Sequence, residues 1–418
     1  MHATDKPFNI EKRLVYEAYK AVKSNRGAAG VDEQTIEQFE ADLSGNLYRI
    51  WNRMSSGTYF PPPVRAVAIP KKSGGERILG VPTVADRGVA QMVVKLVIEP
   101  ILDPIFLADS YGYRPNKSAL DAVGATRERC WKYDWVLEFD IKGLFDNIDH
   151  ELLLRAVRKH ITCKWALLYI ERWLKAPMVQ EDGTTIERSR GTPQGGVVSP
   201  ILANLFMHYT FDLWMTRTHL DLPWCRYADD GLVHCRTENE AEAVKAELQA
   251  RLAECHLEMH PTKTKVVYCK DGKRKGKYPN VKFDFLGYCF RPRLVRCSRD
   301  NSLFGGFNPA VSPSAMKTMR ATIRDLNLRR QTQLSLQDIA QRLNPLLRGW
   351  IAYYGRYASS ALYPLLRYVN QTLVAWAMRK FKRFKRHKVQ ASEFLLRLAT
   401  ECADLFVHWQ IGMTGVFA

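Results

Sequence analysis

The chain changes its hydrophobic pattern at Pro313, and this change limits the architectures that it can adopt. Before Pro313, short apolar runs of strand length alternate with longer stretches in which apolar residues recur at helical spacing. After Pro313 the helical spacing continues almost throughout, with interruptions at Gly349, Gly355 and Pro364. The chain is also long enough for two or three folded units, so we predict a mixed helix-and-strand unit followed by an all-helical one.

Positive charge is concentrated in this same helical part. The formal net charge of the protein is +19, and the stretch from Pro313 to Gln390 carries 16 Lys and Arg residues against only two acids. Evenly spread charge is typical of any solvated surface, whereas a concentrated block indicates a polyanionic partner such as a nucleic acid. We therefore expect the helical part to bind nucleic acid.

Composition and the N-terminal sequence indicate where the protein works. No apolar run reaches the length of about 18 residues that a membrane span needs, so no membrane partner is expected. Residues 1–13 lack the apolar segment of a secretion signal. The nine cysteines contain no C-x2-C pair that would indicate zinc, and we expect them to be reduced and mostly buried. The expected location is the cytoplasm.

The part before Pro313 predicts an α+β fold around an antiparallel sheet. Residues 9–57 have helical spacing. Strands at 64–69 and 77–81 are expected to form a basic hairpin around the turn 71–76. Further strands are predicted at 135–139, 224–227 and 231–235, and further helices at 84–108, 117–131, 150–175, 237–256 and from an N-cap at Ser199.

Three aspartates stand at the ends of these predicted strands. Asp140 ends one strand, and Asp229 and Asp230 form the turn between two others. If those strands are neighbours in one sheet, the carboxylates could hold two divalent cations about 3.5–4 Å apart, as nucleotidyl transfer requires. Each signal alone also fits a structural role, because aspartate stabilises turns.

Several segments together resemble the palm motifs of reverse transcriptases in order and spacing. These are residues 139–150, 191–196 followed by Ser199-Pro200, and 227–230. Further similarity lies at 69–77, 111–115, 260–265 and 285–287, so that the resemblance covers about residues 60–290. The residues of 260–265 fit a polar turn equally well. The resemblance implies a right-hand-like polymerase with fingers, palm and thumb.

The resemblance also implies roles for individual residues. Asp140, Asp229 and Asp230 would be catalytic metal ligands for two Mg²⁺ ions, with Mn²⁺ as the alternative, and the Ile141 carbonyl would be an additional ligand. The expected contacts to the incoming dNTP are cations on the triphosphate at Lys71 and Arg77, an aromatic gate below the sugar at Phe145, and Gln194 beside the base. Asp146 and Asp149 are expected to be structural. Phe145 taken alone would fit an ordinary core position.

The helical part resembles the thumb, or maturase domain, of group II intron-encoded proteins, on the segment 343–355. Such proteins copy intron RNA into cDNA during retrohoming and assist splicing. Residues 379–388 are predicted to form one helix with an apolar stripe and a phosphate-binding face. The expected RNA contacts are Arg348, Arg379, Lys380, Lys382, Arg383, Lys385 and Arg386. Few residues follow Gln390, so the chain resembles the short members that lack the HNH endonuclease.

The expected organisation is an N-terminal helical extension at 1–60, fingers and palm at 61–305, the thumb or maturase domain at 306–390, and a short segment at 391–418 that could bind DNA. Expected partners are group II intron RNA, an RNA template with a DNA primer, dNTPs and target DNA, with the protein a monomer or a homodimer. Two alternatives stay open. One is a group II-like reverse transcriptase that acts in defence or repair without an intron, and the other is a splicing cofactor without catalysis.

Overall fold

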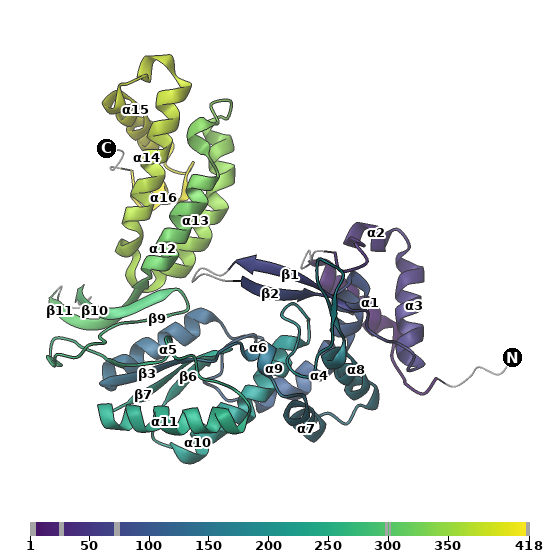
Figure 1. The fold of residues 1–418 in the computed structure, drawn as a ribbon. Helices are drawn as coiled ribbons and strands as arrows, with labels where there is room; N and C mark the ends of the chain where they lie inside the picture. The colour runs from purple at the N-terminus through teal and green to yellow at the C-terminus, as the bar shows by residue number, and fades with distance from the viewer. Residues whose placement is uncertain (1–5, 25–28, 71–75, 297–299, 301, 415–418) are drawn as a thin grey trace. The chain divides into compact units, whose positions relative to one another are not determined.

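The computed structural model forms two compact units. The first contains residues 1–122 and 137–266, and the second contains residues 123–136 and 267–418 (Figure 1). The residues described are 6–24, 29–70, 76–296, 300 and 302–414. No helix of this described part is long and apolar enough to cross a membrane.

The first unit starts with helices, as the spacing over 9–57 predicts. These are α1 Lys12–Ser24, α2 Ile36–Glu40 and α3 Leu43–Ser55. A capping box starts α2, because the Thr35 hydroxyl accepts from the Gln38 amide at 3.2 Å and the Gln38 side chain accepts from the Thr35 amide at 2.9 Å.

The predicted basic hairpin is confirmed by two antiparallel strands. They are β1 Val64–Pro70 and β2 Glu76–Val81, with Arg65 opposite Val81. The short strand β4 Met178–Val179 runs parallel to β1, and β5 Thr185–Ile186 completes the order β2-β1-β4-β5. The turn of the hairpin, with Lys71, lies outside the described residues.

A second sheet has the order β6-β7-β3-β8. Its strands are β6 Trp224–Tyr227, β7 Asp230–Cys235, β3 Trp135–Asp140 and β8 Lys265–Tyr268. The predicted strands are therefore neighbours, as the metal-site hypothesis requires. The helix α11 Glu238–Glu254 follows β7 and begins with Thr237, whose hydroxyl accepts from the Glu240 amide at 3.1 Å.

The remaining helical segments of the first unit divide more finely than predicted. They are η1 Val84–Ala90, α4 Gln91–Leu102, η2 Asp103–Ile105, α6 Leu144–Asn147, α7 His150–His160, α8 Lys164–Lys175, α9 Ser199–Met207, η3 His208–Asp212 and α10 Leu213–Thr218. The predicted N-cap at Ser199 is wrong. Ser199 is the first residue of α9, and its hydroxyl is 2.7 Å from that of Thr192. The cap residue is Val198, whose apolar side chain forms no capping hydrogen bond.

The second unit contains a sheet that the sequence analysis did not identify. Its strands are β9 Phe283–Phe285, β10 Tyr288–Arg296 and β11 Leu303–Val311, in the order β11-β10-β9. The helix α5 Ala119–Lys132 contributes to the same unit, where the Trp131 indole donates to the Phe307 carbonyl at 3.1 Å.

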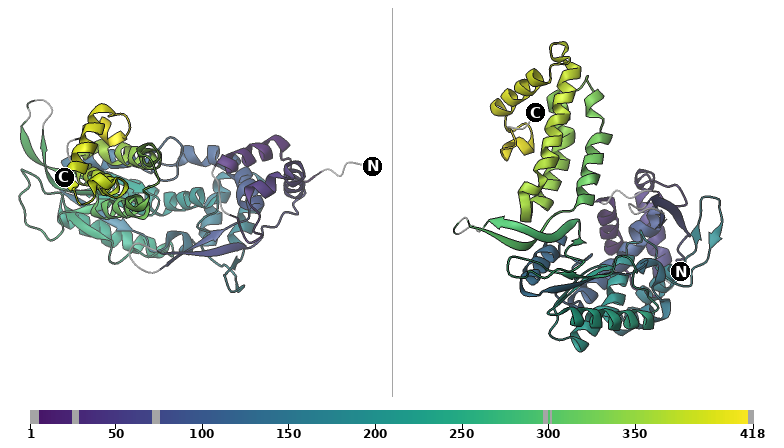
Figure 2. Two further views of the ribbon diagram at one scale, coloured as in Figure 1. Left: turned by 90° about the horizontal axis from the view of Figure 1, so that it is seen from above. Right: turned by 60° about the vertical axis from the view of Figure 1, so that its left-hand side comes forward.

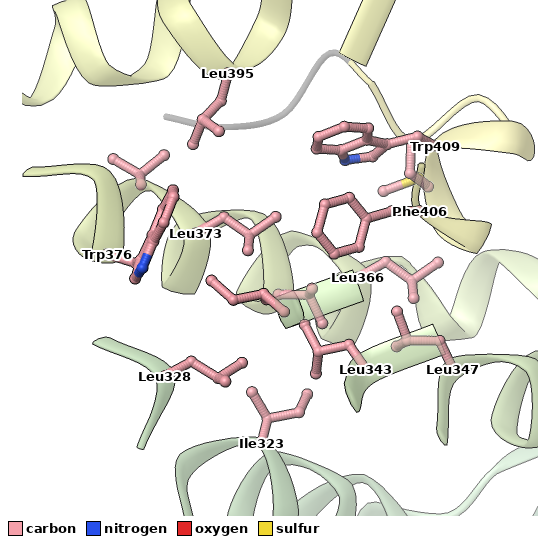
Figure 3. Close-up of a cluster of buried hydrophobic side chains, with 14 of the residues drawn as sticks. Ile323, Leu328, Leu343, Leu347, Leu366, Leu373, Trp376, Leu395, Phe406 and Trp409 are labelled. Carbon is pink, nitrogen blue, oxygen red and sulfur yellow. The ribbon is translucent and has the colours of Figure 1, made fainter. Parts of the chain in front are cut away.

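The predicted helical part follows β11. Its elements are α12 Pro313–Asp325, η4 Leu328–Arg330, α13 Leu336–Ala358, η5 Ser359–Leu362, α14 Tyr363–Lys380, η6 Lys382–Phe384, α15 Lys388–Glu401 and α16 Val407–Gln410. The long green and yellow helices lie side by side in both views of Figure 2, and α12 contacts α14. One core joins them, with Ile323, Leu343, Leu373, Trp376 and Phe406 pointing toward one another (Figure 3).

Residues after 390 belong to this same core. Leu395 of α15 and Trp409 of α16 are buried in it. The Asn370 side chain of α14 accepts from the Trp409 indole at 3.1 Å and donates to the Met413 carbonyl at 2.9 Å. The last described residues are therefore held by both apolar packing and buried hydrogen bonds.

Candidate active site

Three carboxylates gather where β3, β6 and β7 meet. Asp140 is the last residue of β3, and Asp230 is the first residue of β7. Asp230 is paired with Tyr227 across a tight turn that contains Asp229, and Ala228 takes the left-handed φ of +58° in that turn. Because β7 lies beside β3, the sheet brings Asp140 to the Asp229-Asp230 turn, as the sequence analysis anticipated.

A glycine makes this close approach of β3 and β7 possible. A Cβ atom on Gly231 would lie 2.1 Å from Cζ of Phe139, far below any contact distance. Phe139 cannot retreat, because its buried ring packs against Phe211 with the ring centroids 4.9 Å apart. A larger residue at 231 would therefore push apart the strands that carry the aspartates.

A fully buried arginine forms a hydrogen bond with the main chain of the Asp229-Asp230 turn. The Arg226 guanidinium donates to both carboxylate oxygens of Asp212 at 2.7 Å and to the Ala228 carbonyl at 3.0 Å. It also donates to Ser110 at 2.8 Å and to Asn204 at 3.1 Å. Paired with a buried carboxylate and satisfied by these acceptors, the charge is tolerated in the interior. Sequence reasoning missed this residue, because a lone arginine in a strand gives no sign of its partner.

The surroundings of Asp230 raise the pKa of its carboxyl group. The protein atoms packed around its carboxyl group, and then the charges of Asp229 and Asp140, raise its pKa to about 7. The side chain nevertheless keeps an exposed surface. The two neighbouring carboxylates thus repel a negative charge on Asp230 at a surface that is open to solvent. Such repulsion is what a bound cation would relieve.

In the structure a lysine neutralises part of this negative charge. The Lys263 ammonium forms an ion pair with the Asp140 carboxylate. The Asp140 carbonyl accepts from the His260 amide at 2.8 Å, and Ile141 pairs with Met259. The segment 260–265 therefore lies beside the carboxylates. The sequence analysis had left open whether this segment is a polar turn or has a functional role.

The donor set fits a hard divalent cation, because it consists of carboxylate oxygens that repel one another. As placed, however, no three Asp, Glu, His or Cys side chains within the described ranges are grouped to hold a metal ion. Asp140 faces Lys263 instead. Metal binding would thus require the Asp140 carboxylate to exchange the lysine for the cation.

A cleft of about 880 Å³ within the first unit is lined by Asp140 and Asp229, whereas Asp230 is not among its lining residues. Its lining brings together Asp140, Ile141, Phe145, Gln194 and Asp229, all of which were predicted to be site residues. For Arg77 only the backbone is described, and it pairs with Ile69 in the hairpin.

Phe145 stands in this cleft on the short helix α6. Its ring is half-buried and meets Tyr113 edge-on, with centroids 6.4 Å apart. Tyr113 is 52% exposed and has the left-handed φ of +56°, which is uncommon for a bulky residue. Its ring also lies 6.3 Å from that of Tyr227. Phe145 is therefore at a surface shared by aromatic residues, and Tyr113 is a neighbour that the motif analysis did not single out.

Asp146, which was expected to be structural, forms hydrogen bonds with Gln194, a residue that was predicted to contact the substrate. The Gln194 side-chain nitrogen donates to both oxygens of Asp146 at 3.1 Å, while the Gln194 main-chain carbonyl accepts from the Gly80 amide of β2 at 3.1 Å. Asp149 instead caps α7, since it accepts from the Leu152 amide at 2.9 Å. Asp146 therefore orients the Gln194 side chain, whereas Asp149 orders a helix start.

The predicted basic helix at 379–388 is wrong. Helix α14 ends at Lys380, η6 follows, and α15 begins only at Lys388. The Lys380 ammonium donates to the Thr332 and Leu334 carbonyls at 3.0 and 2.7 Å, and Arg379 donates to the Arg329 carbonyl at 3.1 Å. These two cations tie the end of α14 to main-chain carbonyls of the segment 329–334.

The other predicted RNA contacts differ in their surroundings. The Arg383 guanidinium lies over the Phe384 ring at 4.6 Å. The Arg383 side chain is nevertheless exposed, as are those of Arg348, Lys382, Lys385 and Arg386. Arg379 is exposed too, although it donates to the Arg329 carbonyl.

Comparisons with known proteins agree with these features. Residues 69–290 match the family model of reverse transcriptases (RNA-dependent DNA polymerases), and residues 316–394 match the group II intron maturase-specific domain. Protein YkfC of Escherichia coli is 30% identical over 70% of this chain and 85% of its own length.

Two other similar proteins are more distant or match a smaller part. The group II intron-encoded protein LtrA of Lactococcus lactis is 35% identical over 47% of this chain, which spans 32% of LtrA. A telomerase structure from Candida albicans superimposes with a TM-score of 0.44 and 14% identity over 91% of this chain and 68% of its own. From the family match and the similarity to YkfC, we conclude that the chain belongs to the reverse transcriptase family of RNA-dependent DNA polymerases.

Proposed function

We propose that this reverse transcriptase copies group II intron RNA into cDNA during retrohoming and assists splicing of that RNA as a maturase. The observation that carries the polymerase part is that the sheet brings Asp140 beside the Asp229-Asp230 turn, with Asp140 and Asp229 lining the cleft. The maturase part is supported by the match of residues 316–394 to the maturase-specific domain and by the similarity to LtrA.

In this proposal the three aspartates and the Ile141 carbonyl hold two Mg²⁺ ions, or Mn²⁺ as the alternative. When bound, such ions activate the primer hydroxyl and neutralise charge on the triphosphate. Lys71 and Arg77 bind the triphosphate of the dNTP as positive charges. Phe145 packs below the sugar and excludes a 2′ hydroxyl, and Gln194, oriented by Asp146, contacts the nucleotide.

The proposed partners are an RNA template with a DNA primer, dNTPs, group II intron RNA and target DNA. The exposed cations of the helical part, Arg348, Lys382, Lys385 and Arg386 among them, support the RNA role. The intron assignment draws on LtrA, of which this chain spans about a third. A group II-like reverse transcriptase that acts in defence or repair without a cognate intron is the second candidate.

Primer extension tests the polymerase. The purified protein should extend a DNA primer on an RNA template with Mg²⁺, and Asp229→Asn should abolish extension, because the substitution removes a metal-ligand charge almost isosterically. Asp221→Asn is the matched control, since Asp221 is exposed in the loop before β6 and should retain full activity. Near-normal extension by Asp229→Asn at ordinary Mg²⁺ would contradict the metal assignment.

A splicing assay separates the intron proposal from the second candidate. DNA flanking the coding sequence should encode a catalytic RNA, and transcripts of it should splice faster with the protein than without it. Flanking DNA that encodes no such RNA, together with active primer extension, would favour the defence or repair enzyme.

A further inference from the structure

The connection between β8 and β9 is a second concentration of positive charge. Residues 269–282 contain five lysines and one arginine against a single acid, Asp271. The segment precedes Pro313, so it lies outside the basic helical part. All of its residues are described and belong to the second unit.

Arg274 is the anchor of this loop rather than a free cation. Its guanidinium donates to Asp271 at 2.8 and 2.6 Å, to the Tyr133 carbonyl at 2.8 Å and to the Cys130 carbonyl at 3.0 Å. Asp271 also accepts from the backbone amides of Lys273 and Arg274, both at 2.8 Å. The only acid of the loop is thus engaged by Arg274 and the turn, and it does not neutralise the lysines.

Aromatic packing makes the loop rigid. The Tyr278 ring lies 4.5 Å from that of Trp135 and 4.6 Å from that of Tyr268. The chain crosses these rings at Gly276, where a Cβ atom would lie 2.5 Å from Tyr278. The Gly272 amide donates to a β11 carbonyl at 3.0 Å. A loop held at so many points has little conformational freedom left to lose when it binds a partner.

Four lysines project from this rigid base with exposed side chains. They are Lys273, Lys275, Lys277 and Lys282, which we call the β8–β9 lysine surface. None of them is within ion-pair distance of an acid in the part of the chain that the structure describes. Other exposed lysines do form ion pairs. The Lys23 ammonium, for example, lies 2.8 Å from the Glu40 carboxylate.

We propose that the β8–β9 lysine surface binds the phosphodiester backbone of a nucleic acid, separately from the cations of the helical part. The ligand must be polyanionic, because four positive charges are held together without a counter-charge. Lysine ammoniums act as point charges without the bidentate geometry of arginine, so the contacts do not depend on base sequence. The inference rests on the proposed function only in assuming that nucleic acid is present at the protein.

The test compares two triple variants with equal loss of charge. The loop variant is K273Q/K275Q/K277Q. The control is K23Q/K175Q/K245Q, whose lysines pair with Glu40, Glu171 and Glu242. Equilibrium binding is measured over a salt series with two probes, a blunt RNA–DNA duplex and an RNA hairpin without a primer. A triple lysine-to-arginine variant of the loop tests rescue by charge alone.

The loop variant should lower the slope of log K against log salt by about 0.7–0.9 for each lost contact, hence by roughly 2 or more, on at least one probe. Its affinity should converge with that of the wild type near about 1 M salt, and the arginine variant should restore the slope. The single change Lys275→Gln, which should lower the slope by about 0.7–0.9, gives the answer if the triple variant melts early.

A loop variant whose slopes equal those of the control on both probes would overturn the inference. That failure is distinct from failure of the proposed polymerase, which is scored by primer extension with saturating duplex. A wild-type protein that extends no primer, yet binds with a slope that depends on the loop, would contradict the proposed function and support this inference. The probe that responds tells whether duplex or structured RNA is the ligand.

Discussion

Single side chains in the cleft have surroundings that their residue type does not reveal. Phe145 is half-buried against the exposed Tyr113, so its ring is available to a ligand, whereas Phe139, only six positions earlier, is sealed in the core. Both are phenylalanines that flank Asp140. Their different exposure allows the proposed sugar gate to be tested against a matched core residue.

Phe145→Ala should admit ribonucleotides, because the removed ring would no longer meet a 2′ hydroxyl. We expect the ratio of kcat/KM for a dNTP over the matching ribonucleotide to fall by at least about tenfold, which is about 1.4 kcal/mol of transition-state free energy. Steady-state kinetics with both nucleotides, together with the melting temperature, check this. Phe139→Ala, the control, should cost about 3–5 kcal/mol of stability and leave the ratio unchanged. An unchanged ratio in Phe145→Ala would exclude Phe145 from sugar selection.

At the scale of elements, the position of the Asp229 turn depends on β6 and on the helical segment before it. Arg226 of β6 and Asp212 at the end of η3 are both fully buried and bonded to each other. The same guanidinium holds the carbonyl of Ala228, next to Asp229. One ion pair between a strand and a helical segment therefore holds the turn that carries Asp229.

Arg226→Met should destabilise the protein by about 3–5 kcal/mol, because it leaves the Asp212 charge buried without a partner. The double variant Arg226→Met/Asp212→Leu should recover much of that loss, since neither charge is then buried. Denaturant unfolding of the two single variants and the double variant gives the coupling free energy. Additive losses would show that the pair does not act as a unit.

The break between α14 and α15 separates two kinds of cation that the sequence presents as one run. Lys382→Gln/Lys385→Gln/Arg386→Gln should lower the salt slope of RNA binding by about 0.7–0.9 for each contact, because these side chains are exposed. Arg379→Gln/Lys380→Gln should instead lower the melting temperature, because their bonds to three carbonyls are lost. If both variants changed the slope by the same amount for each charge, this division would be wrong.

For the whole molecule, the proposed synthesis and splicing functions depend on different units. The aspartates belong to the first unit, and the exposed cations of the maturase-like helices belong to the second. Asp229→Asn should therefore lose primer extension and keep its stimulation of intron splicing, measured with the same protein preparation. Loss of both activities without unfolding would show that the two functions share one site.

The sequence by itself determined the family and most local elements of this protein. The order of its motifs identified the palm, and the placement of Asp140 before one turn and of Asp229 and Asp230 within another predicted their convergence, because strand ends and tight turns are local properties. The change to continuous helical spacing at Pro313 likewise located the maturase-like part. These signals are carried by neighbouring residues, so a single chain is enough to read them.

The tertiary structure decided what depends on contacts between distant residues. The Arg226–Asp212 pair, the Lys263–Asp140 ion pair and the Asp146–Gln194 hydrogen bonds join residues that lie 14, 123 and 48 positions apart. Spacing along the chain does not encode such partners. The same reason explains the error at 379–388, where Lys380 turns to carbonyls of a distant loop and the helix ends. A cation that already bonds within the fold is not available to a ligand. Only the tertiary structure shows which cations these are.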